Sequence, residues 1–449
     1  MRNRDMTQGP IAKQIILYAI PLLLGNLLQQ LYNAFDAIVV GNFVSNEALA
    51  AVGASGPLIN MIIAFFMGMS TGASVLISQY YGARDHKGMH DTVHTSMMLA
   101  VILGVLLSIV GIMASRTLLA WMATPPEVME AALTYLRIFF YGMTGLTIYN
   151  MGAAVLTAVG DSKRPLYFLM VSAILNISGN LFFVNVLHMG IAGVALSTII
   201  AEAVSAVLVV ILLCRAETGY RLIPRDLRIN MPTVKRIAMI GLPGGIQQAI
   251  ISCSNIMVQS YINKLGAPIV AGYSASSKID AFIMLPTQTM ALAVTTFVGQ
   301  NLGAKNVPRA RKGVNISLTL ALVITIALSI LVLCLKSPLL RIFSPDPDVL
   351  RYGVEFMYVF VPGYFILAFT QIIPGALRGA GNVNFATLVC IISFVVLRQL
   401  YLFIVTQFNH TITSVALGYP VTWMIAAIVL ALYYRRSDWS SFEQASDSM

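Results

Sequence analysis

The chain has 449 residues, of which 58% are hydrophobic and only 10% are charged, whereas about a quarter of the residues are charged in an average soluble domain. This composition excludes an ordinary soluble protein and predicts an integral membrane protein. The four cysteines show no C-x-x-C spacing, so neither a disulfide framework nor a zinc site is indicated.

Apolar runs long enough to cross a bilayer, about 20 residues each, recur along the whole chain. They predict an all-α protein with twelve transmembrane helices, at approximately 14–40, 50–79, 93–115, 130–158, 165–187, 189–213, 234–261, 268–298, 314–335, 350–377, 383–407 and 411–434. The first run is too long and too polar for a signal peptide. We therefore interpret it as a transmembrane helix.

The formal charge of +10 follows from where the basic residues lie. If both termini are cytoplasmic, most Lys and Arg fall in cytoplasmic loops, as the positive-inside rule requires. The opposite side then receives only Arg116, Lys264, Lys336, Arg341 and Arg351. This distribution predicts a multi-pass protein of the cell membrane whose partner is the lipid bilayer, and it explains the basic charge without nucleic acid.

The two halves of the chain repeat one another. SQYYGARD at 78–85 matches GQNLGAKN at 299–306, and LTAVGD at 156–161 matches LRGAGN at 377–382, both 221 residues apart. Such a constant register indicates internal duplication. Because each half has six helices, both halves enter the membrane in the same sense, and the repeats are parallel.

The predicted organisation follows from this repeat. The N-lobe of helices one to six covers residues 1–213, and a cytoplasmic linker follows at 214–233. The C-lobe of helices seven to twelve covers residues 234–434, and a cytoplasmic tail follows at 435–449. Two similar six-helix bundles facing each other create a central cavity, which is where secondary transporters commonly bind their substrates.

Helix one carries a carboxylate inside an apolar segment. Gln29, Asn33 and Asp36 follow at helical spacing, so they share one face. An ionised acid at the bilayer centre costs about 2.5 to 3.5 kcal/mol on insertion scales. The stripe is either a hydrogen-bond seam between helices or a proton or cation site. Pro21, earlier in the same helix, would allow the bend that couples such a site to helix shape.

Helices four, five and six add further polar side chains to the N-lobe. Asn176 and Asn180 are one turn apart in helix five, Thr198 and Glu202 are one turn apart in helix six, and Asn150 lies in helix four. Their oxygen atoms suit Na⁺ or a hydrogen-bonded proton and not soft metals. For single amides, interhelical packing remains the alternative.

The C-lobe carries its own charges within predicted helices. Asp280 lies two residues from Lys278 in helix eight, and Arg398 lies in helix eleven. Asp280 either forms a structural pair or takes part in coupling, and the partner of Arg398 is either Asp280 or an anion of the substrate. Met61 and Met284 are predicted cavity residues, because methionine repacks around varied ligands.

Several motifs together resemble the multidrug and toxic compound extrusion (MATE) family of cation-coupled exporters over essentially the whole chain. They are LLQQLYNAFDAIVVG, QYYGARD, AVGDSKRP, GIAGVALST, SKIDAFIMLP and TTFVGQNLGA. The resemblance implies two six-helix lobes around a V-shaped cavity and antiport of amphipathic, often cationic compounds against H⁺ or Na⁺.

The resemblance also implies a cation site in the N-lobe. Asp36, Asn176 and Thr198 match its positions and would hold Na⁺ if that is the coupling ion, but Asn180 stands where the family usually has an Asp. A lone acid in an apolar cavity favours its protonated form and hence proton coupling. Glu202, one turn beyond Thr198, is hypothesised to replace the missing acid.

The sequence therefore predicts a secondary active exporter of amphipathic, cationic small molecules, working by alternating access with H⁺ or Na⁺ and without a cofactor, and a monomer. It predicts neither an enzyme nor a channel, because no catalytic constellation and no repeated filter-like loop occurs. The alternative is a flippase for lipid-linked cell-envelope precursors. The few cations within helices, Arg137, Lys278 and Arg398, argue against it.

Overall fold

The computed structural model describes residues 4–122, 124–216, 219–408, 411–437 and 439, and within these residues every regular element is a helix. The predicted tail at 435–449 lies mostly outside the described residues. Eleven described helical segments are long and apolar enough to cross a membrane. The all-α membrane fold is therefore confirmed.

The chain packs as two compact units. Unit 1 comprises Met1–Asp5 and Ile20–Leu242, and unit 2 comprises Met6–Ala19 and Pro243–Met449. This division by packing differs from the sequence boundaries at 213 and 234, because the first turns of two long helices belong to the unit of the other repeat. The chain passes from one unit to the other just before Ile20, next to Pro21, and just before Pro243. These two prolines are repeat equivalents.

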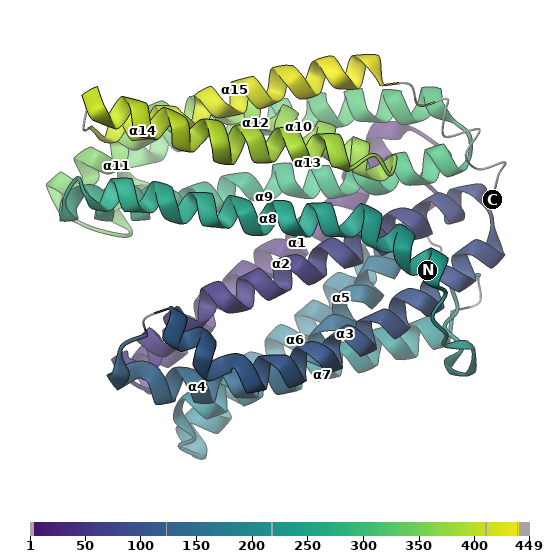
Figure 1. Ribbon diagram of the computed structural model, residues 1–449, viewed down its shortest axis with the longest axis horizontal. Coiled ribbons are helices and arrows are strands. Elements are labelled where there is room, and N and C mark those ends of the chain that lie inside the picture. Colours follow the sequence, from purple (N-terminus) through teal and green to yellow (C-terminus); the bar gives the residue numbers. More distant parts are fainter. Residues whose placement is uncertain (1–3, 123, 217–218, 409–410, 438, 440–449) are drawn as a thin grey trace. The chain divides into compact units, whose positions relative to one another are not determined.

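The helices of the first repeat are labelled in Figure 1. They are α1 (Ile11–Phe43), α2 (Asn46–Ala83), α3 (His86–Trp121), α4 (Pro126–Tyr141), α5 (Met143–Ala158), α6 (Lys163–Leu181) with the π-helix η1 (Phe182–Val186), and α7 (Gly190–Cys214), followed by the 3₁₀-helix η2 (Pro224–Asp226).

The second repeat follows the same order. Its helices are α8 (Met231–Asn263), α9 (Ala267–Gly303), α10 (Val307–Arg341), α11 (Pro347–Phe360), the 3₁₀-helix η3 (Val361–Gly363), α12 (Tyr364–Gly379), α13 (Asn384–Ile391), the π-helix η4 (Ile392–Leu397), α14 (Arg398–Phe408) and α15 (Ile412–Arg436).

The predicted fourth span is divided into α4 and α5, each of 16 residues, with Gly142 between them. A β-carbon on Gly142 would lie 2.3 Å from Cγ2 of Ile199 in α7, so only glycine allows this close approach. Gly363, 221 residues later, ends η3 between α11 and α12. Each repeat thus interrupts its fourth helix at the same position, and twelve spans remain the correct count.

The repeated motif after the second helix of each half forms one local structure. Arg84 and Lys305 both adopt the left-handed conformation, with φ of 56° and 58°. The next residues, Asp85 and Asn306, accept hydrogen bonds from the backbone N–H groups of Gly88 and Arg309. These side chains cap α3 and α10, so the sequence repeat encodes a tight turn followed by a capped helix.

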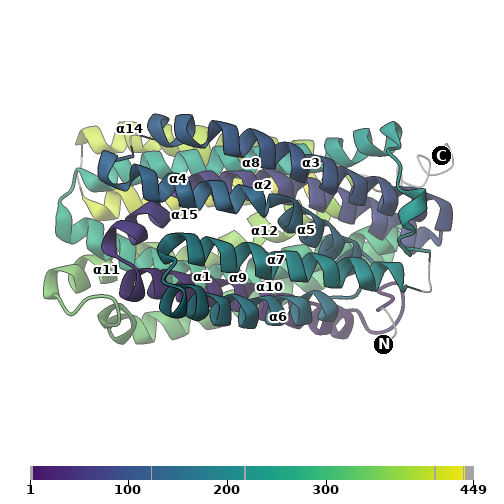
Figure 2. The ribbon, with the colours of Figure 1, turned by 90° about the horizontal axis from the view of Figure 1, so that it is seen from below.

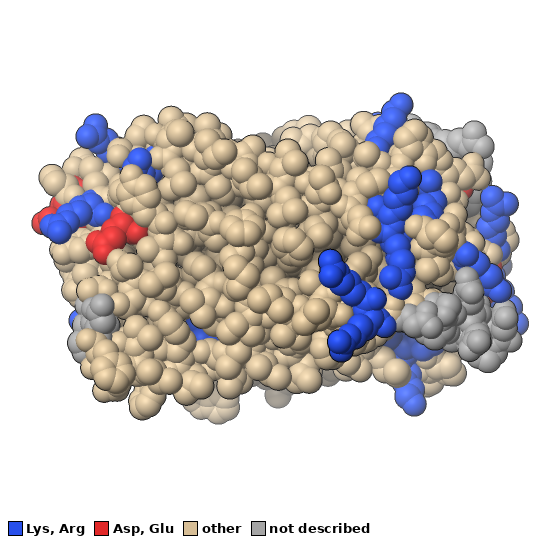
Figure 3. All heavy atoms as spheres, turned by 90° about the horizontal axis from the view of Figure 1, so that it is seen from above, with Lys and Arg blue, Asp and Glu red and all other residues tan. Residues whose placement is uncertain are grey.

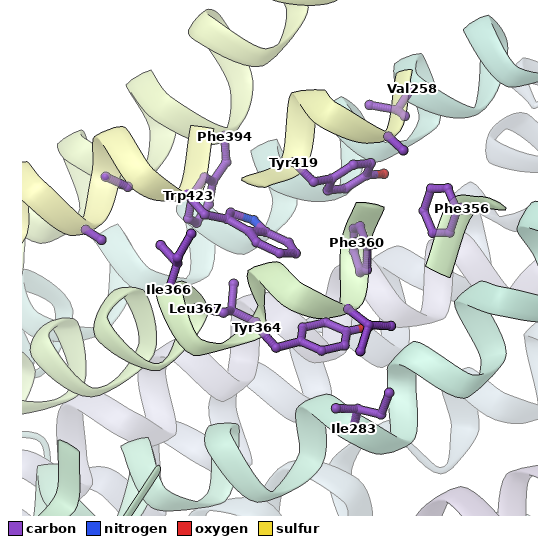
Figure 4. Packing of buried hydrophobic residues seen from close by; sticks show 14 of the residues in the cluster. Val258, Ile283, Phe356, Phe360, Tyr364, Ile366, Leu367, Phe394, Tyr419 and Trp423 are labelled. Atoms are coloured by element: carbon purple, nitrogen blue, oxygen red, sulfur yellow. The ribbon is translucent and has the colours of Figure 1, made fainter. Parts of the chain in front are cut away.

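Each unit has its own apolar core. In unit 1, α6 and α7 pack side by side (Figure 2), and a buried cluster around Leu136 and Phe140 joins α4 to its neighbours. In unit 2 an aromatic cluster dominates, with Phe360 packed against Tyr364, Tyr419 and Trp423 (Figure 4). On the face shown in Figure 3, charged side chains lie mainly toward the two ends, as expected for a protein surrounded by lipid.

Candidate functional site

The polar residues predicted from helices one, five and six form one cluster in unit 1. Asp36 comes from α1, Asn176 and Asn180 from α6, and Thr198 from α7. Both asparagines are completely buried. Because an unpaired buried amide costs free energy, their hydrogen bonds determine what this site can do.

Asn180 connects all three helices. Its Nδ2 donates to Oδ1 of Asp36 over 2.5 Å and to Oδ1 of Asn176 over 3.0 Å. Its Oδ1 accepts a short hydrogen bond from the hydroxyl of Ser197 in α7. The residue that departs from the family pattern is therefore the direct hydrogen-bond donor to the Asp36 carboxylate.

Asn176 completes the network one turn earlier on α6. Its Nδ2 lies 3.1 Å from Oγ1 of Thr198, 3.4 Å from Oγ of Ser197 and 3.3 Å from the hydroxyl oxygen of Tyr32. Since its Oδ1 accepts from Asn180, both ends of the amide are occupied. Asn176 therefore orients Asn180 rather than touching Asp36 itself.

The oxygen atoms that the cluster offers as ligands decide how well a cation fits. The carbonyl oxygens of Asn176 and Asn180 each accept one hydrogen bond inside the cluster, and each keeps a second lone pair. Protonation of Asp36 needs only the carboxylate oxygen that does not accept from Asn180. The cluster therefore offers a proton one carboxylate without a change of partners, and it offers Na⁺ the same single carboxylate together with neutral oxygens.

Glu202 lies in the same part of unit 1 but outside this network. It lies one turn beyond Thr198 on α7, and its side chain is half-buried. Among the described residues it forms no hydrogen bond or ion pair with Asp36. The hypothesis that Glu202 replaces the missing acid of helix five stays a prediction.

Three predicted polar residues of unit 1 do not join the cluster. Gln29 and Asn33 are exposed, and Nδ2 of Asn150 donates to the carbonyl of Leu146 in its own helix. Asp36 bonds to α6, and the predicted place of Gln29, Asn33 and Asn150 in a substrate cavity stays a prediction.

The structure adds two residues that the sequence analysis missed. Tyr32 lies one turn before Asp36 on α1, and Ser197 lies beside Thr198 on α7. The helical spacing of Tyr32 from Asp36 could have identified it, whereas an isolated serine in an apolar helix carries no distinguishing signal.

No salt bridge joins Lys278, Asp280 and Arg398 to one another among the described residues of unit 2. Asp280 accepts a short hydrogen bond from the hydroxyl of Tyr364, and Nζ of Lys278 lies 5.5 Å from the ring centre of Phe343. The predicted pairings of Asp280 with Lys278 or Arg398 are therefore wrong. Arg398 is buried against Tyr419.

The hinge at Pro21 and the cavity role of Met61 and Met284 stay predictions. Pro21 lies inside an uninterrupted α1, where a hinge would have to form. Met61 in unit 1 is half exposed and Met284 in unit 2 packs against the aromatic cluster. Because these two methionines belong to different units, their joint role in a cavity stays a prediction.

A second polar cluster joins α3 to the segment before α8. Nε2 of His94 accepts from the backbone N–H of Ile223 over 2.9 Å, and its Nδ1 donates to the carbonyl of His90. Nε2 of His90 lies 3.4 Å from Oδ2 of Asp226. The three side chains could meet at one metal ion, but both nitrogens of His94 are already bonded. The cluster fastens the loop to α3.

Comparison with known proteins places these features in a family. A sequence model described as MatE matches residues 21–182 and 243–404. The chain is 28% identical over 446 residues to "Probable multidrug resistance protein YpnP" of Bacillus subtilis, covering 99% of both chains. It is 26% identical over 428 residues to "Probable multidrug resistance protein NorM" of Thermotoga maritima, covering 93% of this chain and 90% of that one.

The fold has solved counterparts. A structure described as an outward-facing conformation of a multidrug resistance MATE family transporter of the MOP superfamily superposes with a TM-score of 0.91, with 25% identity over 99% of both chains. A MOP superfamily transporter from Pyrococcus furiosus gives a TM-score of 0.92 with 24% identity over 99% of both chains.

Proposed function

The chain belongs to the MatE family, and from that premise we propose that it exports amphipathic small molecules across the cell membrane in exchange for protons, by alternating access. The curated relatives described above are named as multidrug resistance proteins, which supports drug efflux. Neither is described as a lipid flippase, so that alternative is not carried forward. Both termini would face the cytoplasm, as the distribution of basic residues requires.

The observation that carries the proposal is the single carboxylate of Asp36 within an otherwise neutral network. Asn180 donates to one of its oxygens, and the neighbouring amides bond to each other and to hydroxyls. A proton can therefore bind to Asp36 without new ligands. A proton that moves inward down a membrane potential supplies about 2.3 kcal/mol per 100 mV, which sustains a roughly fiftyfold gradient of a neutral substrate.

Coupling requires that protonation of Asp36 changes the shape of the unit. When the carboxylate becomes neutral, its hydrogen bond from Asn180 weakens, since charge-assisted bonds are about twice as strong as neutral ones. α1 would then be held less firmly to α6. Pro21, where the packing of the chain passes from unit 2 to unit 1, is the position at which α1 would bend.

The test is dye efflux from proteoliposomes under an imposed pH gradient and, separately, under an imposed Na⁺ gradient. We expect the wild-type protein to export rhodamine 123 with the pH gradient and not with Na⁺ alone, and Asp36→Asn to lose this coupled export. Asp91→Asn, which removes an acid at the loop end of α3, is the matched control and keeps it. Equal export by Asp36→Asn and wild type would disprove the proposal.

A further inference from the structure

Unit 2 contains a buried cation without a carboxylate partner. Arg398 is only 3% exposed, and in the described part of the chain no carboxylate oxygen lies within 4 Å of its guanidinium. Its Nε and Nη2 each lie 3.4 Å from Oγ1 of Thr422, and its Nη1 lies 3.5 Å from Oδ1 of Asn255. A guanidinium has five N–H donors, so these long contacts to neutral oxygens satisfy its hydrogen-bonding capacity only in part.

Asp280, a buried-helix acid of the same unit, bonds to Tyr364 and not to Arg398. The guanidinium carbon of Arg398 lies 4.4 Å from the ring centre of Tyr419, and Phe360 packs against both Tyr419 and Tyr364, as Figure 4 shows. Tyr364 in turn donates its hydroxyl hydrogen to Asp280. Aromatic rings thus lie between Arg398 and Asp280, and this carboxylate does not form a salt bridge with the buried cation.

The internal repeat shows what this position corresponds to. Tyr419 is the equivalent of Thr198, 221 residues earlier, and Asn255 is the equivalent of Asn33, 222 residues earlier. The equivalent of Asn176 is Leu397, the residue next to Arg398. Two cluster residues of the first repeat, Thr198 and Asn176, therefore correspond to a ring that contacts Arg398 and to the residue next to it.

The local backbone fixes Arg398 in this place. It directly follows the π-helix η4, a distortion that frequently occurs at functional sites. The carbonyl of Phe394 in η4 accepts from Ser254 of α8 over 2.8 Å, and Nε2 of Gln399 donates to the Ser254 carbonyl over 3.1 Å. These bonds hold α8, including Asn255, against the arginine.

A hollow lies next to two residues of this site, Asn255 and Tyr273, while Arg398 itself is buried behind them. Its volume is about 440 Å³, and it is lined by Asn255, Ile256, Gln259, Tyr273, Ser274 and Ser277. Asn255 is the contact of Arg398, and the hydroxyl of Tyr273 lies 3.2 Å from that of Tyr419, the ring under the guanidinium. Its amide and hydroxyl groups can donate to an anionic oxygen without contributing negative charge.

We propose that Arg398 and this hollow bind the carboxylate of a zwitterionic or anionic amphipathic compound. The carboxylate takes the place of the Asn255 oxygen at Nη1, and the rest of the compound lies in the hollow that Asn255 and Tyr273 line. This site deepens the proposed export function and rests on it. It widens the substrate class beyond the cations that the sequence predicts.

The test uses two dyes that differ in one group. Rhodamine 110 carries a free carboxylate, and rhodamine 123 is its methyl ester. Binding of each dye to the purified full-length protein is measured by fluorescence anisotropy for wild type, Arg398→Gln, Arg398→Lys and the control Lys336→Gln. Lys336 is a cation of α10 that lies over Tyr358, outside the hollow.

We expect Arg398→Gln to weaken binding of rhodamine 110 about tenfold or more, as loss of a charge-assisted hydrogen bond implies, and to leave binding of rhodamine 123 unchanged. Arg398→Lys should recover part of the loss, and Lys336→Gln should bind both dyes as wild type does. Monodisperse elution and retained binding of rhodamine 123 show that a variant is folded.

Two outcomes would overturn the proposal. One is a wild-type protein that binds rhodamine 123 but not rhodamine 110, and the other is an equal change for both dyes in Arg398→Gln. Failure of the proposed function is separate, because it appears as uncoupled export of rhodamine 123 in the Asp36 experiment.

Discussion

Replacing Asn180 with Asp should change the ion that the cluster accepts. The substitution puts a carboxylate where Nδ2 of Asn180 now lies, 2.5 Å from Oδ1 of Asp36. Two ionised carboxylates about 3 Å apart repel each other by about 5 kcal/mol at an effective dielectric constant of about 20. That energy equals a factor of several thousand in an equilibrium constant, so the pair must hold either a shared proton or a cation.

The expected gain is Na⁺ dependence. With two acids, a sodium ion finds two charged ligands, and Oδ1 of Asn176, which loses its hydrogen bond from residue 180, becomes a third oxygen. We expect Asn180→Asp to export rhodamine 123 under an imposed Na⁺ gradient, which the wild-type protein should not do, while Asn180→Ala exports under neither gradient.

The assay is the proteoliposome efflux measurement with equal tenfold gradients of H⁺ or Na⁺, extended by thermal stability with and without Na⁺. A bound ion stabilises the protein that it binds, so NaCl should raise the melting temperature of Asn180→Asp relative to the same concentration of KCl. If Asn180→Asp responds to Na⁺ no more than wild type in both measurements, Asp36 is not part of an ion site arranged as described.

Three further tests, which use five substitutions, address the packing that supports these sites. Asn176→Leu removes the amide that bonds to Asn180 and to the hydroxyls of Tyr32 and Thr198, and it should lower the free energy of unfolding by about 3 kcal/mol or more. Tyr32→Phe removes one long bond and should lower it by less than about 1 kcal/mol; chemical denaturation in detergent compares the two, and equal losses would contradict the assigned geometry. His94→Phe removes the acceptor of the Ile223 N–H, so hydrogen exchange at that amide should accelerate roughly tenfold, and an unchanged rate would show that the loop is held by other contacts. A β-carbon added at Gly72 would lie 2.3 Å from the carbonyl oxygen of Ile237, so Gly72→Val should lower the free energy of unfolding by about 1 to 3 kcal/mol and lower the melting temperature with it. Gly53 lies at an open position, so Gly53→Val should leave the melting temperature unchanged.

The sequence by itself determined the class, the spans and the repeat. Hydrophobic runs reveal membrane helices because lipid cannot satisfy backbone polar groups, so a spanning segment must be apolar and must form its backbone hydrogen bonds within helices. The offset of 221 residues identified equivalent positions. In the structure Arg84 and Lys305 share the left-handed conformation, and Gly142 and Gly363 lie at the interruption of the fourth helix of their repeats. Asp36, Asn176, Asn180 and Thr198 could be named because a polar side chain inside such a helix is rare.

Only the tertiary structure decided which of these polar residues meet. Gln29 and Asn33 share a face of α1 with Asp36 but are exposed, and Asn150 bonds within its own helix, so residue type and spacing alone do not select the members of the cluster. Which turns of a helix face meet a neighbouring helix is set by packing over the whole helix and not by the residues on one stripe. For the same reason the sequence could not show that Asp280 bonds to Tyr364 and leaves Arg398 without a carboxylate.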